Sequence, residues 1–199
     1  CPHAQVYLPR CMSAFVGADI TTALLASGIC SKPDTRMLVD IGTNGEIALW
    51  HRGQLSCCST AAGPAFEGAG LSMGMAGKTG AVDHVRVQDG ALQAHVIGGG
   101  APKGICGSGV IDALACLVEL EQLDETGLLE QDPAPVAPPV CLTQKDVRMV
   151  QLAKSAICAG LSTLLRVEGL CGADAAELAV AGGFGSYLDV DSAGRIGLL

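Results

Sequence analysis

Aromatic side chains and positive charges are both scarce in this 199-residue chain, which has one tryptophan, two tyrosines and three phenylalanines. Lysine and arginine number 12 against 20 acidic residues, so the formal net charge is −8. That balance argues against the basic footprint of nucleic-acid-binding proteins and against a polybasic membrane-binding surface. No apolar run approaches the roughly 18 residues of a membrane-spanning helix. We therefore expect no nucleic acid and no membrane among the partners.

The ten cysteines lack the spacing of a metal site. No Cys-x-x-Cys pair occurs, and Cys57 and Cys58 are adjacent, which fits neither a zinc site nor a ferredoxin cluster. We therefore expect reduced structural thiols in a cytoplasmic protein. No signal peptide is visible. Because the chain begins with Cys1 rather than Met and has no clear stop at Leu199, we expect the natural termini to lie beyond both ends.

Hydrophobic periodicity predicts a single α/β domain over residues 1–199, with a surface loop or insertion at the Pro-rich, acidic residues 124–140. Short turns predict that the first three strands form an antiparallel meander, and the helices are expected to flank a mixed sheet. The expected helices are 14–28, 108–123 and 144–167, and the expected strands are 36–41, 46–50, 55–60, 82–87, 91–97 and 178–181.

The first candidate site is the turn between the first two strands. Asp40 ends an apolar strand, and Thr43 and Asn44 follow between Gly42 and Gly45. Glycines let backbone N–H groups approach an anion closely, and a carboxylate can orient a water or the hydration shell of Mg²⁺. The simplest ligand for such a tip is a nucleotide phosphate with its metal. The alternative is an ordinary Asn-Gly hairpin turn.

Two further glycine clusters are candidates. Gly182, Gly183 and Phe184 follow a buried strand, where a double glycine lets the backbone lie flat against the nucleoside of a nucleotide or simply permits a strand-to-helix turn. Gly107 and Ser108 open a helix, which predicts either an anion site or a capped helix start. The second cluster has neither the Walker A nor the G-x-G-x-x-G register. A nucleophilic role for Cys106 is disfavoured because no nearby histidine is evident in the sequence.

The helix after Thr143 carries a polar face. Gln151 and Lys154 belong to that face, which is either part of a purine and ribose site or a solvated surface. The four histidines are scattered, so none is expected to be a ligand or a base. Glu46 and Glu67 are candidates for acid–base or metal-water roles, with a structural role as the alternative.

Five motifs occur in order: 40–46, 58–68, 104–109, 143–146 and 181–185. Together they resemble the C-terminal domain of the reductive activators of corrinoid proteins, over residues 14–199. Those activators belong to the superfamily of actin, heat-shock-protein and sugar-kinase ATPases. The resemblance implies a ribonuclease-H-like lobe, the second of two lobes that clamp ATP and Mg²⁺.

The resemblance also implies residue roles. Asp40 would orient metal-bound or attacking water, which makes it the expected catalytic residue and, through water, the expected magnesium contact. Gly42, Thr43, Asn44 and Gly45 would hold phosphates. Gly182, Gly183 and Phe184 would face the nucleoside, with Gln151 and Lys154 as weaker contacts.

In that family the whole protein uses ATP to drive an electron from a [2Fe-2S] cluster onto a Co(II) corrinoid. The first lobe and the iron–sulfur domain are missing from this chain, so we expect it to be a fragment of a larger activator, and we expect a corrinoid protein or corrinoid-dependent methyltransferase as partner. Two alternatives stay open: a nucleotide-independent partner-binding module and a small-molecule kinase lobe. The sequence also leaves open whether the chain forms a homodimer.

Overall fold

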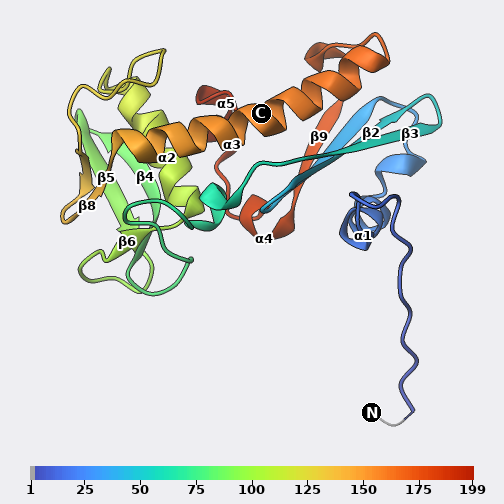
Figure 1. Cartoon of the computed structure of the whole chain (residues 1–199), viewed down its shortest axis with the longest axis horizontal. Coiled ribbons are helices and arrows are strands. Elements are labelled where there is room, and N and C mark those ends of the chain that lie inside the picture. The colour runs from blue at the N-terminus through green and yellow to red at the C-terminus, as the bar shows by residue number, and fades with distance from the viewer. Residues whose placement is uncertain (1–2) are drawn as a thin grey trace.

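The computed structural model describes residues 3–199, and its framework is a four-stranded mixed sheet (Figure 1). The strands are β1 (Arg36–Ile41), β2 (Gly45–His51), β3 (Gln54–Thr60) and β9 (Glu177–Ala181), in the order β3-β2-β1-β9. The first three are antiparallel, as the short turns predict, and β9 runs parallel to β1. The predicted α/β class and antiparallel meander are therefore confirmed.

Alternation along β1 gives the sheet two apolar faces. Val39 packs toward α3 (Gln144–Val167), whereas Leu38 packs toward α1 (Ala18–Ser27) and the following 3-10 turn Ile29–Ser31. Successive strand residues point to opposite sides, so one short strand supplies both cores. Asp40 belongs to the α1 side by the same alternation, at the end of the strand.

A second sheet carries the other half of the molecule. It contains β4 (Ala81–Gln88), β5 (Ala91–Val96) and the two-residue β6 (Gly104–Ile105), in the order β5-β4-β6. α2 (Gly107–Glu119) packs on β4. Figure 1 shows α3 extending from the first sheet across to this second one. Its inner face joins both halves in one hydrophobic core that includes Ile47 and Ile105.

Helix α3 begins and ends as its sequence predicts. The Thr143 side chain accepts from the backbone N–H of Asp146, and the Asp146 carboxylate accepts from the Thr143 N–H at 2.8 Å. This reciprocal pairing satisfies two backbone donors at the start of the helix. Asp146 also accepts the Ser72 N–H at 2.7 Å, so the cap fixes the 68–74 loop to the helix.

The expected surface loop at 124–140 is more ordered than its composition suggests. It contains β7 (Ala134–Ala137) and leads into β8 (Val140–Leu142), which pair as an antiparallel hairpin. Leu129, Val136 and Val140 are buried in the main core. The prolines hide this pattern because they occupy positions beside the buried side chains rather than replacing them.

The remaining elements are short. They are the 3-10 turns Pro64–Glu67 and Gly172–Asp174, the single helical turn α4 (Gly182–Gly185) and α5 (Val190–Arg195). The predicted glycine turn after β9 is thus one turn of helix. Among residues 3–199, none of the helices has the length and apolarity to cross a membrane.

Candidate functional site

The tip between β1 and β2 lies directly beside α4. Asp40 is level with Ala181 in the parallel β1–β9 pair. A Cβ on Gly182 would lie 2.3 Å from the Asp40 Oδ1 atom, and Gly182 has a φ of +86°. Only a glycine can take this position without displacing the carboxylate. Two glycine turns more than 130 residues apart therefore meet at one edge of the sheet.

The tip is also tied to the turn after β3. The Gly63 N–H donates to the Thr43 carbonyl at 2.8 Å, and the Thr43 hydroxyl donates to the Glu67 carboxylate. Thr43 and Asn44 are otherwise exposed. These contacts join the first motif to the second, so the position of the tip depends on the 64–67 turn.

An aromatic pair continues the contact to the other motifs. The rings of Phe66 and Phe184 stack with centroids 5.3 Å apart and planes 15° apart. The first residue of α2, Gly107, lies against the same pair: a Cβ there would be 1.9 Å from the Phe66 carbonyl oxygen and 2.9 Å from the Phe184 ring. The 104–109 motif therefore contacts both the 58–68 motif, at Phe66, and the 181–185 motif, at Phe184.

A cavity of about 590 Å³ lies beside the aromatic pair, and its lining does not include residues 40–45 of the tip. Its wall includes Phe66, Glu67, Gly107, Ser108, Gly183 and Phe184. Cavities of this size accommodate small organic ligands and cofactors. The start of the 13-residue helix α2 lies in the wall, and helix N-termini favour negatively charged groups.

The glycines at the site have two different surroundings. A Cβ on Gly42 would meet nothing closer than 3.8 Å, and one on Gly183 would meet nothing within 4 Å. By contrast, a Cβ on Gly45 would be 2.6 Å from Thr60 Oγ1. Gly42 and Gly183 therefore leave open space that a ligand could fill, whereas Gly45 is required by internal packing.

A negative field surrounds the Asp40 carboxyl group. Burial raises the pKa of Asp40 above its ordinary value, and the nearby Asp19 raises it further. The pKa of Glu46, which is level with Asp40 on β2, is raised by burial and by Asp19. A cation held through its water shell would relieve the repulsion among these three acids, and this is the kind of magnesium contact that the resemblance implies for Asp40. Within the described part of the chain, no three acidic, histidine or cysteine side chains are arranged to enclose a metal on their own.

Ser108 reaches the cavity wall but its hydroxyl is already used. It is 4% exposed and donates to the Asp83 carbonyl at 2.8 Å. The backbone at the start of α2, rather than this hydroxyl, is what the helix offers to a ligand.

The nine cysteines in residues 3–199 are all free thiols, and burial raises the pKa of Cys57 to about 11.

Gln151 and Lys154 are not brought to this cavity. Gln151 bonds to the Thr126 carbonyl and to Arg148, and Lys154 donates to the Ile196 carbonyl. Both line a different hollow between α2, α3 and α5. Helical spacing identified the polar face correctly, but it does not say which neighbour that face meets.

Phe66 is one of the cavity residues that sequence reasoning did not single out. It lies inside the quoted 58–68 motif, and it is one of only three phenylalanines. The scarcity of aromatics was the available signal, since a phenylalanine within a glycine-rich turn is unusual for this composition.

Comparison with known proteins gives a consistent set of relatives. Residues 34–199 match the family model described as the C-terminal domain of RACo, the ASKHA domain. The chain is 39% identical to the corrinoid activation enzyme RamQ of Eubacterium limosum, over all of this chain and 38% of that protein. It is 29% identical to the [Co(II) methylated amine-specific corrinoid protein] reductase of Methanosarcina barkeri, over 98% of this chain and 40% of that protein.

A solved structure shares the fold. The reductive activator for corrinoid, iron–sulfur protein superposes with a TM-score of 0.87 at 33% identity, over 98% of this chain and 35% of that one. The chain thus spans about two fifths of the length of the curated relatives it matches.

Proposed function

Because this chain belongs to the family of the C-terminal ASKHA domain of RACo, we propose that it is an ATP-binding lobe of a reductive activator of corrinoid proteins. The family match and the similarity to the two named relatives support the assignment. The observation that supports the nucleotide site is the closeness of Gly182 to Asp40, because it puts the two glycine turns side by side at one edge of the sheet.

In this proposal each turn holds a different part of ATP-Mg²⁺. Backbone N–H groups at Thr43 and Asn44 face the phosphates, and the Gly42 N–H, which donates to the Asn44 carbonyl at 3.0 Å, holds the turn in shape. Asp40 orients water on the magnesium or the water that attacks the phosphate. The reaction that bound ATP would provide is transfer of its terminal phosphoryl group to water. Gly183 and Phe184 face the nucleoside, and the positive end of α2 favours the negative charge of the ligand.

The activity of the whole protein is a further part of the proposal. An activator of this kind couples ATP hydrolysis to electron transfer from a [2Fe-2S] domain to a Co(II) corrinoid protein. The names of the relatives support the corrinoid partner, and their greater length leaves room for a cluster domain outside these residues. Bound nucleotide favours the arrangement in which the two lobes are closed over the open one.

Calorimetry with ATP-Mg²⁺ on the intact protein tests the site. Gly183→Val fills the open space beside Phe184, so we expect binding to weaken by at least about tenfold while the free energy of unfolding changes by less than about 0.5 kcal/mol. Gly172→Val is the matched control, because a Cβ there also meets nothing within 4 Å, at a position away from the crevice.

Two results would contradict the proposal. If the intact protein binds no nucleotide but still binds a corrinoid protein, the chain is a partner-binding module. If ATP binds equally well to Gly183→Val and to the control, the crevice beside Phe184 is not the site. Transfer of phosphate to a small hydroxyl or carboxylate compound, in place of water, would identify a kinase lobe instead.

A further inference from the structure

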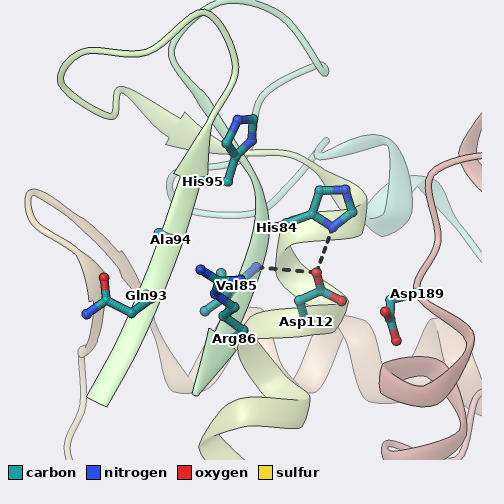
Figure 2. Close-up of a pocket in the computed structure, with 8 residues that line it drawn as sticks. All are labelled: His84, Val85, Arg86, Gln93, Ala94, His95, Asp112 and Asp189. Carbon is teal, nitrogen blue, oxygen red and sulfur yellow. Dashed lines mark hydrogen bonds and ion pairs between the residues drawn. The ribbon is translucent and has the colours of Figure 1, made fainter. Parts of the chain in front are cut away.

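A second cavity, of about 460 Å³, lies between β4, β5, α2 and the segment that precedes α5 (Figure 2). Its most unusual residue is Asp112, which is only 3% exposed although it carries a carboxyl group. Asp112 sits in the middle of α2, where every other residue from Gly107 to Leu117 is also buried. An acid at such a position requires partners, because burial of an unpaired carboxylate is unfavourable.

Only one of the two Asp112 oxygens has a partner. Oδ2 accepts from the His84 Nδ1 atom at 3.0 Å and from the Val85 N–H at 3.3 Å. Oδ1 is buried and has no hydrogen-bond partner among residues 3–199. Figure 2 shows this second oxygen turned toward the side of the cavity where Asp189 lies. Leaving a buried carboxylate oxygen unpaired is unfavourable, so this side of the cavity favours a ligand that donates a hydrogen bond.

The opposite wall supplies a second carboxylate. Asp189 caps α5 by accepting the Ser192 N–H at 2.8 Å through Oδ1. The next residue, Val190, is 62% exposed, whereas Tyr187 lines the cavity beside Phe184. The cavity is therefore a polar hollow with carboxylates on two sides, and one of these carboxylates is followed in the chain by an exposed apolar residue.

The charges around the hollow favour a cation. Besides Asp112 and Asp189, the Asp83 carboxylate pairs with the His95 Nδ1 atom at 2.6 Å, and His95 lines the hollow. Arg86 is the one lysine or arginine in the lining, and it forms no ion pair within the part of the chain that the structure describes. A metal is disfavoured, because no three suitable side chains in residues 3–199 are grouped to hold one.

We propose that this hollow binds the guanidinium group of an arginine side chain from a protein partner. A guanidinium is planar, is weakly hydrated and directs several N–H donors outward, so it can serve Asp112 Oδ1 and Asp189 at once. A lysine ammonium is a compact, strongly hydrated point charge and matches two separated carboxylates less well. The exposed Val190, next to Asp189, would contact the aliphatic stem and adjoining residues of the partner. This inference does not depend on nucleotide binding.

Titration of the intact protein with short peptides, followed by NMR of the His84 ring, tests the proposal. The probes are acetyl-Leu-Arg-Leu-amide, its lysine counterpart, free arginine and Mg²⁺. We expect saturable shifts of the His84 signals with the arginine peptide, and binding of the lysine peptide and of free arginine at least about fivefold weaker, because they lack the fork or the apolar contacts.

Variants locate the binding to the two carboxylates. Asp112→Asn should weaken the arginine peptide by about tenfold or more. Asp189→Asn should also weaken it, and this variant retains the α5 cap because asparagine caps helices as well as aspartate does. Asp191→Asn, in the first turn of α5 and outside the hollow, is the control and should bind as the unmodified protein does.

Four outcomes would overturn the inference. The first is the absence of a shift with any probe, which would leave Asp112 Oδ1 satisfied by water, and the second is equal binding of the lysine peptide. The third is tighter binding of free arginine, which would indicate a small-molecule site, and the fourth is displacement of the peptide by Mg²⁺. If Asp112→Asn fails to fold, the Asp189→Asn result decides alone, and unchanged peptide binding there would overturn it.

Discussion

Two sets of glycines at the crevice show that the same residue type can serve opposite purposes. Gly107 and Gly109 bring the start of α2 against backbone atoms, since a Cβ would lie 1.9 Å from the Phe66 carbonyl or 2.3 Å from the Val82 carbonyl. A Cβ on Gly183, in contrast, would meet nothing within 4 Å, and one on Gly42 would have only the Asn44 carbonyl oxygen near it, at 3.8 Å. A glycine that touches its own protein is part of the packing, whereas a glycine that touches nothing is available to a ligand.

The largest expected effect tests the packed set. Gly107→Ala places a methyl group inside contact distance of the Phe66 carbonyl, so the free energy of unfolding should fall by about 3 kcal/mol as α2 moves away. Urea denaturation measures this. Gly194→Ala in α5 is the control, because a Cβ there meets nothing within 4 Å and alanine favours helix. Equal stability of the two variants would remove the distinction between packed and open glycines.

The aromatic pair lies between the packed and the open side, and its removal should have an intermediate effect. Phe184→Ala loses the stack on Phe66 and part of a half-buried ring, for an expected loss of about 2 kcal/mol. The exposed Phe15 provides the control, and Phe15→Ala should change the free energy of unfolding by less than about 0.5 kcal/mol. A loss as large as that of a fully buried phenylalanine would place Phe184 in the packed set.

The smallest expected effect concerns Asp40, and here the substitution should stabilise the protein rather than destabilise it. Because the folded-state pKa of Asp40 is raised, the folded protein holds this proton more tightly than the unfolded chain does. Stability from this group falls as pH rises from the ordinary pKa to the raised one, and the deficit persists above it. Asp40→Asn should therefore raise the free energy of unfolding at pH 7 by less than about 1 kcal/mol.

Thermal unfolding across pH 3 to 8 checks the Asp40 prediction. The advantage of Asp40→Asn should disappear as the pH falls below the ordinary aspartate value near 4. An advantage that does not change with pH would mean that desolvation of Asp40 and repulsion by Asp19 are not its source. Calorimetry on the same variant should show weaker binding of ATP-Mg²⁺.

Much of the fold could be predicted from local patterns. Thr143 and Asp146 fix the start of α3, and two apolar runs joined by a short turn, residues 36–41 and 46–50, give the first two strands. These signals are local, because a helix cap involves residues three apart and a hairpin needs only a short turn. The β7–β8 hairpin was not predicted because prolines and acids mask its buried Ala134, Val136 and Val140.

The candidate site was predictable where sequence order and space agree. The Asp40 and Gly182 turns follow strands that run parallel and adjacent, so their ends meet. Gln151 and Lys154 show the limit, since helical phase places them on one face but not against a given neighbour. His84 and Asp112 show a second limit. The one sign of their pairing in the sequence was an acidic residue among the apolar residues of α2.

The hydrogen bond from the Thr43 hydroxyl to Glu67 has a consequence for anion affinity. A phosphate oxygen that approaches the Thr43 hydroxyl meets the Glu67 carboxylate, which already accepts the hydrogen bond from that hydroxyl. Glu67 therefore competes with the phosphate for the same donor. In the nucleotide site that we propose, a triphosphate would displace Glu67 from Thr43 and so loosen the contact between the tip and the 64–67 turn that carries Phe66.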